Sequence, residues 1–278
     1  MAQVENQIKN DAEYASTYPI MRGSGSMEAT QEIHIFLADL NPDDETLERY
    51  NKAVAEWNDN HPELSDKMKN CYLCLVFRDA DGNENPVRVL QSARYIRSND
   101  SDYVVQQCHQ DANYFVSKGF TVIREKIEAT SFGINGIPTS DEEMRKYPKY
   151  FEAHIKIGLT DRDSALVTDE EIEQLRYLSK QLSDELHIPV PLSYNQAKKD
   201  VGDCMGFQRF MNVRARTYGR DNFCKMVVDP VVEVIKKAGY RHIKTINEYV
   251  WYDSYPELDK GWIDYTDEEL MRMNHLKI

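Results

Sequence analysis

The sequence is short of long apolar runs and of positive charge, and both shortages narrow the class of protein. No apolar run is long enough to cross a membrane, and the first residues lack the basic and apolar regions of a signal peptide, so we expect a soluble, cytoplasmic protein. Lysine and arginine total 34 against 47 acidic residues, which gives a formal net charge of −13. Because nucleic-acid binding needs a basic surface, this balance argues against a nucleic-acid partner.

Cysteine and recognisable catalytic motifs are also scarce. The five cysteines are scattered and odd in number, a pattern typical of a reduced intracellular chain. Cys71 and Cys74 form a single CxxC pair on a predicted strand, where residues three apart point to opposite faces. The pair therefore predicts two partly buried thiols. The sequence lacks a Walker loop, an HExxH motif, a nucleophile elbow and a dinucleotide fingerprint, so we predict no metal and no cofactor.

What the sequence does contain is a set of chemically matched residues that recur 120 positions apart. His154 lies in the segment FEAHIKI and His34 in the shorter echo EIHIFL. The same spacing separates Gly119 from Gly239, Arg94 from Arg214, Arg124 from Lys244, and Glu128 from Glu248. Five matched pairs at one spacing predict an ancient tandem duplication.

Each half of the chain shows the same predicted order of elements. In the first half, alternating apolar residues predict strands at 33–37, 71–77, 87–96 and 120–128, with helices from 43 and over 103–118. In the second half they predict strands at 152–157, 188–194, 207–218 and 241–252, with helices from 168 and over 222–238. The order is βαββαβ in both, the ferredoxin-like unit. We therefore predict an α+β fold in which a ferredoxin-like unit is duplicated in tandem and the two lobes face one another.

The predicted lobes span 27–130 and 149–278, the second with a C-terminal extension, and a linker containing glycine and proline joins them at 131–148. Residues 1–26 look foreign to both lobes, because MRGS resembles an expression-tag leader and GSGS a designed linker. Residues 2–20 match no familiar tag, and two interpretations stay open. The segment is either vector sequence or a peptide tethered to its binder, which would make the chain a peptide-binding or peptide-modifying protein.

Strand alternation assigns side chains to the sheet face that the helices leave open. Histidine exchanges protons near neutral pH, arginine and lysine bind phosphate or carboxylate, and glutamate orients histidine. We therefore predict catalytic and ligand-binding sets on these faces. The catalytic set is His154, His34, Glu248 and Glu128, and the ligand-binding set is Arg214, Arg94, Lys244, Arg124, Asn212 and Arg216.

These sets predict an enzyme, or a former enzyme, that acts on a small phosphate- or carboxylate-bearing substrate in a cleft between the lobes. A structural or interaction scaffold is the alternative, since charged pairs across strands are ordinary sheet contacts. The two-lobed plan resembles the 2H phosphoesterases, in which each lobe supplies a histidine. That family has His-x-Thr or His-x-Ser twice, whereas this chain has His34-Ile35-Phe36 and His154-Ile155-Lys156, so no catalytic role is carried over from it.

Overall fold

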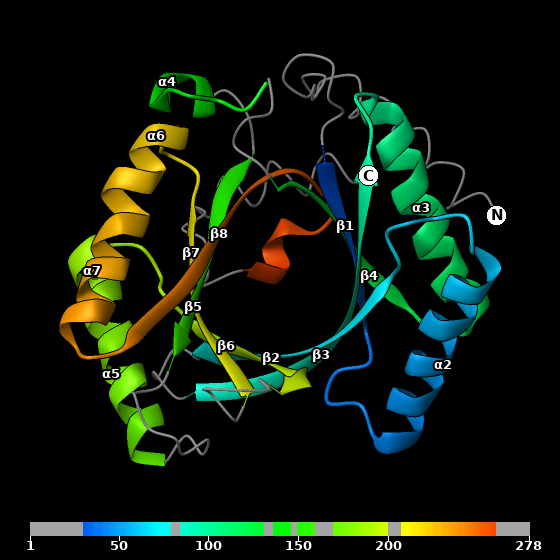
Figure 1. Cartoon of the computed structure of the whole chain (residues 1–278), viewed down its shortest axis with the longest axis horizontal. Coiled ribbons are helices and arrows are strands. Elements are labelled where there is room, and N and C mark those ends of the chain that lie inside the picture. The colour runs from blue at the N-terminus through cyan, green and yellow to red at the C-terminus, as the bar shows by residue number, and fades with distance from the viewer. Residues whose placement is uncertain are drawn as a thin grey trace.

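The structure, a computed structural model, describes residues 30–78, 84–130, 136–145, 149–158, 169–199 and 207–259. The predictions for residues 1–26 and for two parts of the linker, 131–135 and 146–148, therefore lie outside the described residues. The described chain is a mixed α/β fold whose eight antiparallel strands close into a barrel, with the labelled α-helices outside the ring of strands (Figure 1). None of the helices in these ranges is both long and apolar enough to cross a membrane.

The strands are β1 (Thr30–Leu37), β2 (Lys69–Arg78), β3 (Glu84–Arg97), β4 (Val122–Ala129), β5 (Tyr150–Gly158), β6 (Leu192–Lys199), β7 (Phe207–Ala215) and β8 (Arg241–Asp253). The helices are α2 (Asp44–Asn60), α3 (Ser101–Ser117), α4 (Asp141–Met144), α5 (Asp169–Leu186), α6 (Arg220–Phe223) and α7 (Asp229–Lys237). A π-helical turn, η1 (Cys224–Val228), joins α6 to α7, and a 3-10 turn, η2 (Pro256–Asp259), follows β8.

The two halves of the chain repeat one topology, as the sequence predicts. In the first half β1 lies between β3 and β4, and β2 pairs with β3. In the second half β5 lies between β7 and β8, and β6 pairs with β7. Both halves therefore have the βαββαβ order with the strand arrangement of a ferredoxin-like unit.

The prediction of two separate lobes that face one another across a cleft is wrong in one respect. The halves are joined edge to edge, because β2 pairs with β6 and β4 pairs with β8. Each four-stranded sheet alone has two edges with unpaired backbone N–H and C=O groups, and pairing the edges of one half with those of the other satisfies these groups. The open faces of the two sheets consequently line one barrel interior. The alternation of side chains along a strand predicts which face each residue lies on, but it does not predict which strands pair at the edges of the sheet.

The main core lies between the outer face of the barrel and the helices. Asp43 caps α2 and Asp100 caps α3, each carboxylate accepting a backbone N–H three residues on. The helices bury an apolar stripe against Ile33 and Ile35 of β1. That stripe comprises Tyr50, Val54 and Trp57 from α2 and Val104, Cys108 and Phe115 from α3. Gly119 and Gly239 follow their helices with φ of +80° and +87°, the left-handed conformation in which glycine commonly ends a helix.

Prolines explain two departures from the predicted elements of the second half. The sixth strand begins at Leu192 rather than at 188, because Pro189 and Pro191 have no N–H to give to a ladder. The predicted helix at 222–238 runs from Arg220 to Lys237 but contains the π turn η1 just before Pro230. A proline ring clashes with the carbonyl four residues earlier, and a widened turn relieves that clash.

Gly219, at the start of α6, is closely surrounded by backbone. A methyl group added there would overlap the Thr139 carbonyl oxygen and the Ser140 carbonyl carbon. Because main-chain atoms cannot rotate away, we expect Gly219→Ala to lower the free energy of unfolding by about 1–3 kcal/mol, measured by urea denaturation. Thr217→Ala, in the same bend but exposed, is the control and should cost less than about 0.5 kcal/mol. Equal losses in the two variants would contradict the close packing.

Candidate functional site

The candidate site is a network of charged side chains inside the barrel, and strand pairing defines which residues enter it. On β1, Glu32 and His34 alternate with Ile33 and Ile35, which pack in the core. Glu32 lies opposite Glu128 of β4. The two polar β1 side chains therefore point away from the helices and into the barrel. By the same alternation on β5 and β8, Glu152, His154 and Glu248 enter the barrel from the second half.

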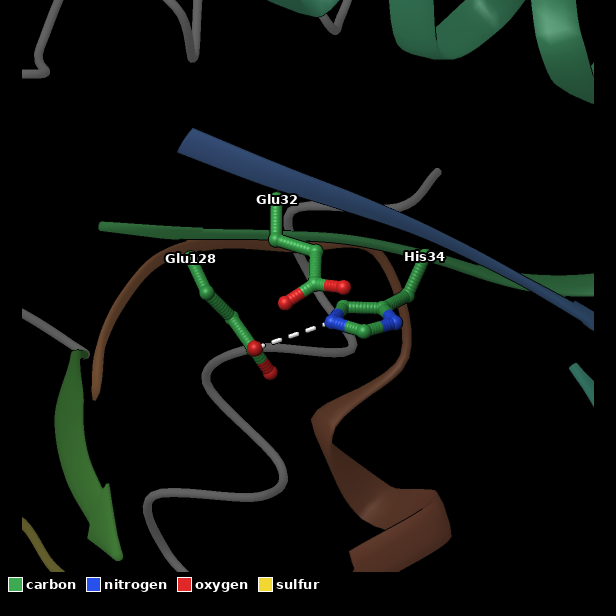
Figure 2. Close-up of side chains that lie close together, drawn as sticks. All are labelled: Glu32, His34 and Glu128. Atoms are coloured by element: carbon green, nitrogen blue, oxygen red, sulfur yellow. Dashed lines mark hydrogen bonds and ion pairs between the residues drawn. The ribbon is translucent and has the colours of Figure 1, made fainter. Parts of the chain in front are cut away.

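The first half contributes the triad Glu32, His34 and Glu128 (Figure 2). His34 Nε2 lies 2.9 Å from Glu128 Oε2, and Gln91 Nε2 contacts His34 Nδ1. Lys69 Nζ donates to Glu32 Oε1 at 3.1 Å. All three side chains of the triad are at most 10% exposed. One histidine nitrogen and two carboxylates are thus held together in a largely buried environment.

The second half contributes the triad Glu152, His154 and Glu248. Asn212 Nδ2 donates to Pro191 O and to Ser193 Oγ, so its Oδ1 faces His154 Nδ1 at 2.6 Å and accepts the Nδ1 proton. His154 Nε2 lies 2.9 Å from Glu152 Oε1 and 3.4 Å from Glu248 Oε2. Both ring nitrogens therefore face acceptors, and the ring is held as an imidazolium.

Lys126 of β4 links the two triads. Its ammonium group forms ion pairs with Glu128 of the first triad and with Glu152 of the second, the latter at 3.0 Å. Burial alone lowers the pKa of Lys126, but the two carboxylates outweigh burial and raise it to about 12. Lys126 is therefore a permanent cation that joins the halves through one buried salt-bridge network.

The protonation states in the second triad follow from its charges. Burial opposes ionisation of Glu152, but the neighbouring Arg214, Lys126 and His154 outweigh burial and hold the pKa of Glu152 well below its usual 4.5. Burial also opposes the His154 cation, yet Glu152 and Glu248 raise the pKa of His154 well above 6.5. Burial, then repulsion from Glu128, raises the pKa of Glu248 to about 7. The triad therefore contains an imidazolium acid, His154, beside a carboxyl group, Glu248, that titrates near neutral pH.

His154 is more accessible than His34. The His154 side chain is 29% exposed, against 10% for His34. On the same interior face of β5, two residues further on, Lys156 lies directly opposite Lys244 of β8. Along these two strands, His154 thus lies between the Glu152–Glu248 pair and the Lys156–Lys244 pair.

The structure brings most of the predicted residues into this interior. His154, Asn212 and Glu248 meet in the second triad, and Arg214 Nε donates to Glu152 Oε2 at 2.6 Å. His34 and Glu128 meet in the first triad. Of the other three predicted arginines, Arg124 shares the interior face of β4 with Lys126, two residues further on. Arg124 forms an ion pair with Asp253, Arg94 lies on the opposite face of its strand, and Arg216 follows the end of β7.

The predicted placement of Arg94 on the open face is wrong. Its guanidinium lies over the Trp57 ring, and its Nε donates to Asp111 of α3, on the helix side of the sheet. The reason is a one-residue difference in register. His34 pairs with Ala93, whereas His154 pairs with Asn212, so counterparts on β3 and β7 are 119 residues apart rather than 120. A one-residue slip moves a side chain to the other face of a strand.

Sequence reasoning missed three members of the network. Glu32 and Glu152 are also 120 residues apart, so the repeat spacing contained the signal for both. Lys126 lies two residues before Glu128 on β4 and therefore shares its face. Its bridging role depends on the neighbouring half of the barrel, which no local pattern indicates.

No protein-family model matches the sequence, and no curated protein matches it either. The chain is similar to a putative monooxygenase from Fusobacterium nucleatum, with 10% identity over 82% of this chain and 95% of that chain and a TM-score of 0.27. It is also similar to chlorite dismutase from Candidatus Nitrospira defluvii in complex with imidazole, with 11% identity over 96% and 100% of the two chains and a TM-score of 0.28. A putative monooxygenase from Lactobacillus acidophilus has 13% identity over 81% and 93%, with a TM-score of 0.25. Likeness at this level carries no argument about function.

Proposed function

We propose that the chain is an enzyme acting on a small phosphate- or carboxylate-bearing substrate at the barrel interior beside His154. One observation carries this proposal. On the neighbouring strands β5 and β8, an imidazolium is flanked on one side by Glu152 and Glu248 and on the other by Lys156 and Lys244. An anion bound by these two lysines would lie next to an acid.

In this proposal His154 is the general acid and Glu248 replenishes its proton. Efficient proton donors have a pKa near the working pH, and the Glu248 pKa of about 7 meets that condition. Asn212 positions the ring through Nδ1, and Glu152 keeps it charged. Arg214 binds Glu152 and Arg124 binds Asp253, so both arginines hold acids in place rather than substrate.

We also infer that the barrel arose by tandem duplication of one ferredoxin-like unit. The repeated strand arrangement supports this inference. Further support comes from Glu32, His34 and Glu128, each of which lies 120 residues before its counterpart in the second triad. The halves then diverged on their third strands, where Tyr95 stands opposite Glu32 but Arg214 stands opposite Glu152.

An anion titration tests the binding half of the proposal. We expect inorganic phosphate to shift the His154 ring resonances in an NMR titration, and Lys244→Gln to weaken phosphate binding about tenfold, the loss of one ionic contact. Lys236→Gln is the control, because Lys236 is exposed on α7 and pairs with Glu233. Shifts that are absent, or that persist unchanged in Lys244→Gln, would contradict the proposal and leave the scaffold interpretation.

A substrate screen tests the catalytic half. Against a panel of phosphate and carboxylate esters, we expect turnover by the wild-type chain and a loss of about 100-fold or more in His154→Gln, the usual contribution of a positioned acid. The fold of the variant is checked by circular dichroism. Undiminished turnover in His154→Gln would remove His154 from the mechanism.

A further inference from the structure

The two triads have the same residue types but different surroundings. Glu152 accepts hydrogen bonds from His154, from Lys126 and from the buried Arg214, so both of its oxygens are engaged by cations. In the first triad, the counterpart of Arg214 is Tyr95, opposite Glu32. The cation on Glu32 is Lys69, whose side chain is 38% exposed. The first triad therefore has less buried positive charge around its carboxylates than the second.

The donor atoms of the first triad are close enough to share one ion. The ligand atoms of Glu32, His34 and Glu128 all lie within 4.8 Å of one another, on the adjacent strands β1 and β4. Figure 2 shows both carboxylates beside the imidazole ring. Lys126 contacts Glu128 through Oε1, whereas His34 Nε2 faces Oε2. Paired, hydrogen-bonded strands hold these three side chains in fixed relative positions.

Gln91 supplies the outer support that a metal-binding histidine needs. Metal-ligating histidines use one ring nitrogen for the ion and hold the other in a hydrogen bond that fixes the ring. The Gln91 amide contacts His34 Nδ1, on the side of the ring away from Glu128. A side-chain amide has both a donor nitrogen and an acceptor oxygen. Turning the Gln91 amide by 180° brings its oxygen to His34 Nδ1, where it accepts the Nδ1 proton and leaves a lone pair on Nε2.

We propose that Glu32, His34 and Glu128 form a binding site for one divalent transition-metal cation. One imidazole nitrogen with two carboxylate oxygens is a ligand set suited to Zn²⁺, Co²⁺ or Mn²⁺, whereas Ca²⁺ takes six to eight oxygens and Cu⁺ takes sulfur. The ion replaces the Nε2 proton that His34 shares with Glu128, and that proton leaves to solvent. The proposal departs from the prediction of no metal and does not depend on the proposed enzymatic function.

Cobalt(II) titration of metal-stripped protein tests the site through its visible absorption band. We expect one tightly bound Co²⁺ per wild-type chain and at least tenfold weaker binding in His34→Gln. His154→Gln is the matched control from the second triad and should bind Co²⁺ like the wild type. Circular dichroism and thermal melting establish that each variant is folded. Glu32→Gln, which keeps the size of the side chain, gives a second, independent loss of a ligand.

Three results would overturn the proposal. The first is a wild-type chain that shows no absorption band and no heat of binding at about 1 mM Co²⁺, a concentration that detects even weak sites. The second is a loss of binding in His154→Gln as large as in His34→Gln. The third is full binding in both His34→Gln and Glu32→Gln, which would place the ion elsewhere on the chain. If His34→Gln does not fold, the comparison of Glu32→Gln with His154→Gln decides the question.

Discussion

Replacing Glu152 with alanine should lower the free energy of unfolding by about 3–5 kcal/mol, the largest loss we expect from a single charged residue in the chain. Glu152 is 1% exposed and accepts from Arg214, Lys126 and His154. Removing one carboxylate leaves three cations together in the barrel without their shared partner. Such uncompensated buried charge is far more costly than the loss of an exposed salt bridge.

The matched control is Glu32→Ala, because Glu32 occupies the equivalent position in the first half. Glu32 forms an ion pair with Lys69, whose side chain is 38% exposed and turns to solvent when the partner is lost. We expect this variant to cost about 1 kcal/mol or less in metal-free buffer. Urea denaturation of both variants and the wild type measures the difference. Equal losses at the two positions would show that the buried cations do not depend on Glu152.

The second large effect is an increase in stability toward mildly acidic pH. Stability falls with rising pH wherever the folded chain binds more protons than the unfolded chain. Glu248 has a pKa of about 7 in the fold against an ordinary 4.5, so the folded chain keeps a proton over that interval and stability falls as pH rises through it. His154, whose pKa is raised well above 6.5, extends the fall to higher pH. Glu152 acts in the opposite sense, because its lowered pKa makes stability fall as pH drops below 4.5.

We therefore expect maximum stability near about pH 5 and a loss on the order of 2–3 kcal/mol by about pH 8. Glu248→Gln keeps the size of the side chain but cannot ionise, so it should flatten the fall between pH 4.5 and 7 and make the chain more stable than wild type at about pH 8. Glu233→Gln, at an exposed position on α7, should leave the profile unchanged. The measurement is urea denaturation across this pH range. A profile in Glu248→Gln that still falls as steeply as in the wild type would contradict the assignment.

Local patterns were sufficient for the order of elements and for the inner faces of the strands that begin each half. Alternation around His34 and His154 places both rings correctly, because both strands are regular and one face of each is covered by helices. Capping residues and terminal glycines mark the helix ends for equally local reasons.

The remaining features depend on contacts between distant segments. Arg94 is on the helix side because the register of β3 is set by its pairing with β1, which a repeat spacing of 120 does not contain. Closure of the barrel depends on edges that meet only when both halves are folded. The protonation of His154 depends on Glu152 and Glu248, and the ionisation of Glu152 depends on cations from β4 and β7. Neither the register nor these pairings is visible in a single stretch of sequence.

The barrel is closed along two seams, where β2 pairs with β6 and β4 pairs with β8. These two seams also set the order of events during synthesis of the chain. The β4 strand is complete at residue 129, but its partner β8 begins only at residue 241, and β6, the partner of β2, begins at residue 192. The first half of the nascent chain therefore has two unpaired strand edges while the second half is translated. Such edges pair readily with another chain, and pairings so distant in sequence form slowly. The seams that remove these edges from the finished barrel make the half-translated chain the stage at which copies associate most easily.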